Sequence, residues 1–152
     1  MRSPLAHKTK YLIDTCYFYE SFAKHEKEFV EFCATHNVGI TSFNVEEVLF
    51  HSHDVNHVIR NRIRSAIKAN LNIVVIDIPI HPGNPVAEGK FIEKYNPLLI
   101  NIIPDPSDAV LAAVATSIGA HVITRDKHHL FTTKLENHFN EKGLKVLNSI
   151  PK

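Results

Sequence analysis

Residues 105–119 read DPSDAVLAAVATSIG, and most of this stretch is an almost wholly apolar helical segment. It runs from Pro106 to Ile118, and Gly119 ends the helical pattern. A helix that is apolar on nearly all sides has no face suited to water, so it belongs inside a domain. The sequence therefore predicts a helix that is central and buried.

Short apolar runs on both sides of this helix are typical of strands, and helical patterns separate them. The expected strands cover residues 11–13, 38–41, 72–78, 121–124 and 144–147. The expected helices cover one helical region from Phe18 to His36, then about 44–52, 55–68, 86–95 and 133–142, whereas 98–103 fits either a helix end or an extended segment. Strands that alternate with helices predict an α/β domain with a mostly parallel central sheet. Without a linker or repeat, residues 1–152 are expected to form one domain.

The composition is that of an ordinary globular protein, with 44% hydrophobic and 22% charged residues among 152. No apolar run approaches the roughly 20 residues needed to span a bilayer, and the start lacks a secretory signal, so we expect a cytoplasmic protein. The net charge is only +1, so a nucleic-acid surface would require local segregation of charge. Cys16 and Cys33 fall in the same helical region and are expected to be reduced core thiols.

Acidic residues lie at or near the ends of the expected strands, where the sites of open parallel sheets collect. Asp14 closes the first strand, and Asp126 comes two residues after the strand that ends at Thr124. The other acids in question are Asp105 and Asp108 at the start of the apolar helix, and Glu46 or Glu47 on the helix after the second strand.

Several carboxylates within a few ångströms repel one another, which raises their pKa values or demands a bound cation. Oxygen ligands suit a hard cation such as Mg²⁺ or Mn²⁺. Such ions can activate water and neutralise charge on a phosphate, so the pattern indicates phosphodiester chemistry.

Most of these acids also have a purely local explanation. Asp105 and Asp108 fit the cap and first turn of a helix, and Asn44 with Glu47 has the spacing of a capping box. Asp126 fits a turn. Asp14 is the hardest to explain locally, because an acid at the end of a buried strand needs a partner.

Three motifs in order resemble those of PIN domains. YLIDT at 11–15 resembles their opening strand and Asp-Thr pair, DPSDAVLAAVA at 105–115 their central helix, and VITRDK at 122–127 their closing strand and acid. The resemblance covers nearly the whole chain. It implies a three-layer α/β/α sandwich and a metal-dependent ribonuclease.

The same resemblance implies which residues form the site. Four acids carry over by position as catalytic and metal-binding residues: Asp14, Glu47, Asp108 and Asp126. Asp105 is implied as an accessory metal ligand and Thr124 as a hydroxyl that orients the site. Glu46 stays an alternative to Glu47, and Cys16 stands where the family often has Asn or Ser.

The small size is similar to that of the VapC toxins of toxin–antitoxin pairs. This implies a homodimer, an antitoxin protein as partner and RNA as substrate. The stretch from His51 to His57 has no counterpart that we can place in the family.

Basic residues could hold the RNA. Arg60, Arg64 and Lys68 recur every four residues beside an apolar helix face, and Arg125 and Lys127 flank Asp126. The stripe could follow a phosphate backbone, or it could be a solvated helix side. His51, His53 and His57 suggest a zinc site, and His53 and His57 have the four-residue spacing of helical zinc ligands. However, no glutamate lies between them as in the metalloprotease pattern, and no further zinc ligand is apparent in the sequence.

The sequence thus favours a Mg²⁺- or Mn²⁺-dependent endoribonuclease. The alternative is a non-catalytic α/β binding module, either receiver-like or a PIN-like domain that only binds RNA or a partner. A receiver would need paired acids at the end of the first strand and a late lysine, whereas Asp14 lies between Ile13 and Thr15.

Overall fold

The computed structural model describes residues 8–51, 56–69, 72–126, 130 and 132–151. Within these residues, five parallel strands form one sheet in the order β3-β2-β1-β4-β5. The strands are β1 (Tyr11–Ile13), β2 (Val38–Thr41), β3 (Ile73–Ile76), β4 (His121–Ile123) and β5 (Val146–Leu147). The expected parallel sheet is confirmed, and each expected strand is present, some of them shorter than expected.

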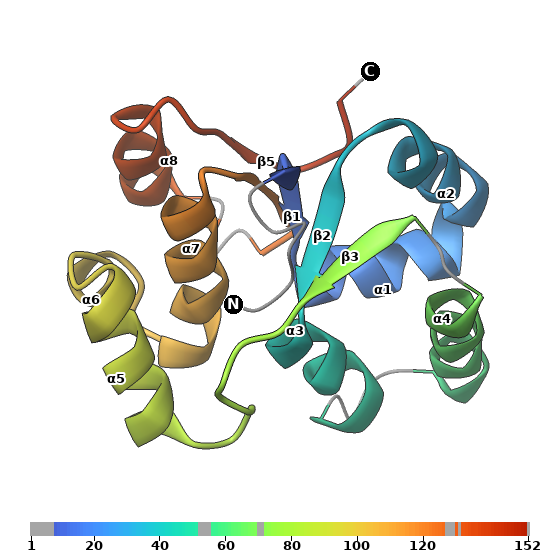
Figure 1. Ribbon diagram of the computed structural model, residues 1–152, viewed down its shortest axis with the longest axis horizontal. Coiled ribbons are helices and arrows are strands. Elements are labelled where there is room, and N and C mark those ends of the chain that lie inside the picture. The colour runs from blue at the N-terminus through green and yellow to red at the C-terminus, as the bar shows by residue number, and fades with distance from the viewer. Residues whose placement is uncertain (1–7, 52–55, 70–71, 127–129, 131, 152) are drawn as a thin grey trace.

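Helices cover both faces of the sheet, so the three-layer α/β/α architecture is also confirmed (Figure 1). One face carries α1 (Thr15–Lys24), α2 (Glu26–Thr35) and α4 (His57–Lys68). The other carries α5 (Pro85–Tyr95), α6 (Leu99–Ile102), α7 (Pro106–Ile118) and α8 (Thr133–Asn140). Each face has its own hydrophobic core, because alternate side chains of a strand point to opposite sides: Leu12 joins one core and Ile13 the other.

The apolar helix predicted at 106–118 is α7, and it is central as expected. Every residue from 109 to 115 is buried. Its ends follow from local chemistry, since the Asp105 side chain accepts a hydrogen bond from the Ser107 N–H, Pro106 occupies the first turn, and Gly119 ends the helix in the left-handed conformation at φ 75°. The N-terminus of α7 is thereby fixed beside the sheet.

The single helical region expected from Phe18 to His36 is wrong, because the chain breaks at His25. His25 has non-helical dihedral angles (φ −138°, ψ 33°) and separates α1 from α2. Phe22 and Phe29 lie on either side of the break, and their rings still pack edge to face, with centroids 5.9 Å apart. The hydrophobic periodicity continues across the break, which is why the sequence resembles one helix.

The helix expected from about residue 44 begins earlier and changes character. Helix α3 (Ser42–Glu46) is capped by Thr41, whose hydroxyl accepts the Asn44 N–H at 3.0 Å, so Asn44 is not the cap. A π-helical turn, η2 (Glu47–His51), follows directly. The ambiguous stretch at 98–103 contains α6. Of the two cysteines expected in the core, Cys33 is buried and Cys16 is exposed.

In the part of the chain that the structure describes, no helix has the length and apolarity needed to cross a lipid bilayer.

A buried polar network ties α5, α7 and α8 together. The Asn96 amide nitrogen Nδ2 donates to Thr116 Oγ1 at 2.9 Å and lies 3.0 Å from His138 Nε2, while Thr116 Oγ1 donates to the Ala112 carbonyl. The Thr116 proton is used on Ala112, so its oxygen accepts from Asn96, which fixes the orientation of the amide. His138 Nε2 must then accept the second amide proton, which requires a neutral ring.

We therefore predict that protonation of His138 destabilises the fold. Burial is the main cause that lowers the His138 pKa, and Lys142 adds to it. The unfolded state then binds the proton more readily, so this stability is fully present above about pH 6.5 and is lost as the pH falls below it. The free energy of unfolding of His138→Gln, which keeps an acceptor but does not titrate, should depend less on pH than that of the wild type between pH 7 and 5. Parallel pH profiles for the two proteins would contradict this role.

Candidate active site

The site lies at the edge of the sheet where β1 and β4 end. These strands are parallel neighbours in register, with Ile13 opposite Ile123. Asp14 continues directly from β1 and donates its backbone N–H to the Ile123 carbonyl at 3.0 Å. Asp14 and Thr124, which are 110 positions apart in the sequence, therefore meet side by side.

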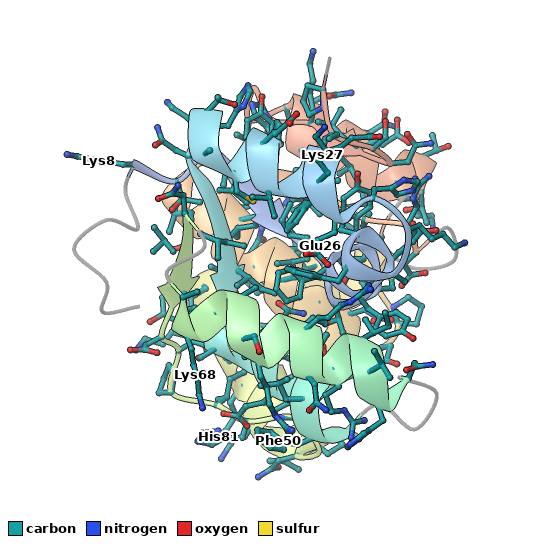
Figure 2. The ribbon with its side chains drawn as sticks, turned by 90° about the vertical axis from the view of Figure 1, so that its right-hand side faces the viewer. Lys8, Glu26, Lys27, Phe50, Lys68 and His81 are labelled. Atoms are coloured by element: carbon teal, nitrogen blue, oxygen red, sulfur yellow. The ribbon has the colours of Figure 1, made fainter. Side chains whose placement is uncertain are left out.

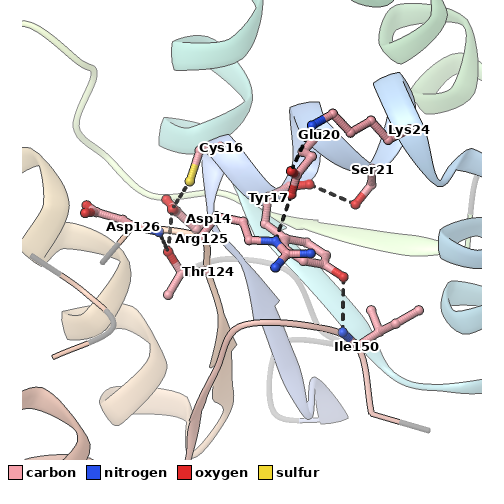
Figure 3. Close-up of polar contacts among 10 residues, drawn as sticks. All are labelled: Asp14, Cys16, Tyr17, Glu20, Ser21, Lys24, Thr124, Arg125, Asp126 and Ile150. Carbon is pink, nitrogen blue, oxygen red and sulfur yellow. Dashed lines mark hydrogen bonds and ion pairs between the residues drawn. The ribbon is translucent and has the colours of Figure 1, made fainter. Parts of the chain in front are cut away.

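Asp14 is buried, with 8% of its surface exposed, and three donors hold its carboxylate, of which Figure 3 shows Cys16 and Thr124. The Thr15 backbone N–H donates to Oδ1 at 2.8 Å, while Cys16 Sγ and Thr124 Oγ1 donate to Oδ2 at 2.9 and 2.7 Å. Burial nevertheless raises the pKa of Asp14, and the nearby charge of Asp126 raises it further. This carboxylate is held in place but is not neutralised by any of these contacts.

Thr124 links the two acids that follow β1 and β4. Its hydroxyl is fully buried, donates to Asp14, and accepts the backbone N–H of Asp126 at 2.9 Å (Figure 3). The hydroxyl thus fixes the path of the chain as it leaves β4 and with it the position of Asp126.

Glu47 is the first residue of the π-helical turn, and its contacts come from two other segments. Thr15 Oγ1 donates to Glu47 Oε1 at 2.7 Å, and Asn44 Nδ2 donates to the same oxygen at 3.2 Å. Burial is the main cause that raises the pKa of Glu47 to about 7, and the charges of Asp14 and Asp108 also raise it.

The electrostatic couplings therefore connect the four acids expected from the sequence. Asp126 acts on Asp14, and Asp14 and Asp108 act on Glu47. Within the described ranges, no group of three or more Asp, Glu, His or Cys side chains is arranged so that it could hold a metal ion. The four acids interact electrostatically, but those in the described residues do not surround one point as metal ligands would.

Glu46 and Asp105 are placed differently from these four. Glu46 Oε1 lies 2.7 Å from Nδ1 of the exposed His81. Asp105 caps α7 and accepts from both the backbone and the hydroxyl of Ser107. Asp105 also lines an open cleft of about 370 Å³, and Glu47 is another of its lining residues.

The chemistry of these donors, although not their arrangement among the described residues, suits a hard divalent cation. The four coupled acids offer only oxygen atoms, which suit Mg²⁺ or Mn²⁺ better than a softer metal. The repulsion between the acids also favours a bound cation. Burial and neighbouring carboxylates raise the free energy of the ionised acids, and a cation among them would lower it.

The basic residues expected to bind RNA are spread over a wider surface. Because α4 connects the parallel strands β2 and β3, it runs from the carboxyl edge of the sheet to the amino edge. Arg60 therefore lies in the part of α4 toward the carboxyl edge, whereas Lys68, labelled in Figure 2, is the last residue of the helix, toward the amino edge. The Arg64 guanidinium lies over the exposed Phe50 ring, 5.8 Å from its centroid.

Arg125 makes contacts within the protein, and its neighbour Lys127 lies outside the described residues. Arg125 Nε donates to Glu20 Oε2 at 2.8 Å, and its guanidinium lies 5.3 Å from the centre of the Tyr17 ring (Figure 3). Of the histidines considered for zinc, His57 is exposed at the start of α4, whereas His53 and the His51 side chain lie outside the described part.

Sequence analysis missed several polar residues of the site. The sequence predicts a core thiol at Cys16, which donates to Asp14, and a helix cap at Asn44, which donates to Glu47. Thr15 bonds to both Asp14 and Glu47. For Thr15, the signal was its position directly after Asp14. For Asn44, the three-residue spacing to Glu47 was visible, but it indicates a side-chain contact and not a cap.

Comparison with known proteins identifies the family. The family model described as PIN domain matches residues 11–133. No curated protein and no solved structure gives a significant match. PIN domains are generally nucleases, and they typically use divalent metal ions. Because the match extends over most of the sequence, from β1 to the start of α8, the chain belongs to the PIN-domain family.

Proposed function

We propose that this protein is an endoribonuclease that hydrolyses RNA phosphodiester bonds with Mg²⁺ or Mn²⁺. In this proposal Asp14, Glu47, Asp108 and Asp126 are the catalytic and metal-binding acids. The observation that carries it is geometric: β1 and β4 end side by side, Thr124 joins the buried Asp14 carboxylate to Asp126, and Thr15 joins it to Glu47. The pKa values of Asp14 and Glu47, which burial and neighbouring carboxylates raise, agree with acids gathered in one place. Family membership supports the nuclease class.

The protein's own residues bind and orient the reacting groups. Thr124, Cys16 and the Thr15 N–H hold the Asp14 carboxylate, and the Thr15 hydroxyl holds Glu47. Asp105, which lines the same cleft as Glu47, serves as an accessory acid. A divalent cation, when bound, would activate water and offset charge that develops on the phosphate. Arg60, Arg64, Lys68, Arg125 and Lys127 are proposed to contact the RNA.

We further propose that the protein is the cytoplasmic toxin of a toxin–antitoxin pair, acts as a homodimer, and is held inactive by its antitoxin. The support is the small size, which is similar to that of VapC toxins, together with the three motifs that resemble PIN domains. A small antitoxin-like reading frame immediately upstream of the gene would favour this role.

The first prediction is that Asp14→Asn abolishes RNA cleavage. A carboxylate that binds the cation contributes several kcal/mol, so we expect a loss of at least about 100-fold in the rate on single-stranded RNA with millimolar Mn²⁺. The matched control is Asp77→Asn, because Asp77 also directly follows a strand but is exposed. Asp77→Asn should keep wild-type activity. Full activity of Asp14→Asn, with contaminating nuclease excluded, would refute the catalytic assignment.

The second prediction concerns Glu47 in the metal-free protein. Its folded pKa of about 7 lies above the usual value of 4.5, so the folded state binds the proton more tightly and loses stability as the pH rises between these values. Glu47→Gln keeps an acceptor toward Thr15 without the charge. In chelator, the variant should therefore gain stability relative to the wild type as the pH rises from about 4.5 to 7, as chemical denaturation would measure.

Glu46→Gln is the control for this measurement, because Glu46 pairs with the exposed His81 and should give no such gain. If Glu47→Gln and the wild type have the same pH dependence, the repulsion that supports the site is absent.

The third prediction is that the stripe on α4 binds phosphates without reading sequence. Replacing Arg60, Arg64 and Lys68 together with alanine should weaken binding of different RNAs alike. Each lost contact should reduce the slope of log affinity against log salt by about 0.7 for single strands. A triple alanine variant of Lys10, Lys142 and Lys145 controls for net charge. Equal slopes in the two variants would make the stripe a solvated helix side.

A further inference from the structure

Asn44 is a buried residue of the acidic site, and its position in the sequence predicts only a capping role. Its side chain is 2% exposed, and it lies in α3, three residues before Glu47. Its polar atoms contact Thr41 at the end of β2, Thr15 at the start of α1, and Glu47. Residues from three segments of the chain thus converge on one amide group.

The direction of each hydrogen bond follows from the available protons. The Thr41 hydroxyl accepts the Asn44 backbone N–H, and its single proton points to Asn44 Oδ1 at 2.6 Å. The amide nitrogen Nδ2 therefore points the other way and donates to Thr15 Oγ1 at 2.8 Å and to Glu47 Oε1 at 3.2 Å. The reversed amide would set its carbonyl oxygen against the Glu47 carboxylate, which accepts hydrogen bonds and has none to donate when ionised.

The Thr15 hydroxyl extends this chain. Because it accepts from Asn44, its own proton is available for Glu47 Oε1 at 2.7 Å, and its backbone N–H donates to Asp14 Oδ1. All hydrogen bonds to Glu47 from the described residues therefore end on Oε1. Neither of these hydrogen bonds uses the other carboxylate oxygen, Oε2, so Oε2 can bind a ligand from outside the protein.

We propose that Asn44 is a positioning residue of the nuclease site, which holds Glu47 Oε1 on the protein side so that Oε2 faces the cation and substrate. This inference rests on the proposed function. Asn44 acts through Thr15 and Glu47 and touches neither RNA nor cation. Partners that orient ligating carboxylates in this way typically change metal affinity or activity by roughly 10- to 100-fold when they are removed.

The test compares two buried asparagines. Asn44→Leu removes both donors at similar size. Asn96→Leu removes a comparable pair of bonds, to Thr116 in α7 and His138 in α8, which are not residues of the acidic site. Both variants should lose thermal stability in chelator, because each leaves buried polar groups without a partner. Both variants lose stability for the same reason, so a difference between them in the response to Mn²⁺ would come from a role of Asn44 in the site.

The measurement is the Mn²⁺ concentration that gives half of the maximal rise in melting temperature, and the concentration that gives half-maximal RNA cleavage. Asn44→Leu should raise both by roughly 10- to 100-fold, with cleavage recovering at high Mn²⁺ and the KM for RNA unchanged. Asn96→Leu should leave both concentrations at the wild-type values. An Asn44→Leu variant that shifts them no more than Asn96→Leu would overturn the inference.

Thr15→Val and Thr15→Ser provide a second pair in case Asn44→Leu fails to fold. The valine lacks the hydroxyl that links Asn44 to Glu47 and should show the same shift in Mn²⁺ concentration, whereas the serine keeps the hydroxyl and should not. Equal behaviour of these two variants would also overturn the inference. If the wild type itself shows neither a Mn²⁺-dependent rise in melting temperature nor cleavage, the proposed function fails and this inference fails with it.

Discussion

The Asp14 carboxylate occupies the edge of the sheet because β1 and β4 pair in parallel and bring the Thr124 hydroxyl within 2.7 Å of it. The rest of the site is built outward from that contact. The Thr124 hydroxyl accepts the backbone N–H of Asp126 and so positions that residue. Thr15 joins two of the acids, since its backbone N–H donates to Asp14 and its hydroxyl donates to Glu47. The buried helix α7 packs behind the sheet and brings Asp108 into the same electrostatic neighbourhood. A shift of one residue in the pairing of β1 with β4 would separate all of these groups.

The acids of the site lower the free energy of unfolding of the protein. Burial and neighbouring charge raise the pKa values of Asp14 and Glu47, so the ionised acids destabilise the metal-free protein at neutral pH. The two hydrophobic cores provide the compensation, with Ala109 to Ala115 buried on one face and the rings of Phe18, Phe22 and Phe29 packed on the other. Such local destabilisation at a functional site, offset elsewhere in the structure, is common in enzymes.

Much of this architecture could be predicted from the sequence, because it depends on local patterns. The strands show as short apolar runs, and α7 shows as a helix without a polar face. The break at His25 could not be predicted, since Phe22 and Phe29 keep a helical spacing across it. The Thr41 cap was missed because Asn44 and Glu47 have the same spacing as a capping box. The contact of Asn44 with Thr15 joins two segments that meet only in the folded chain, and so no local pattern predicts it.

The pairing of β1 with β4 also has a consequence for synthesis. Asp14 and Thr124 are separated by 110 positions, and the strand pair between them is non-local. Such pairs must overcome the entropy of closing a long loop before they gain any contact energy. A polypeptide that leaves the ribosome N-terminus first therefore exposes Asp14 and Glu47 well before Thr124 and Asp126 exist. The complete set of acids cannot assemble on a nascent chain until β4 and Asp126 have emerged, so the site is absent while most of the chain is being made.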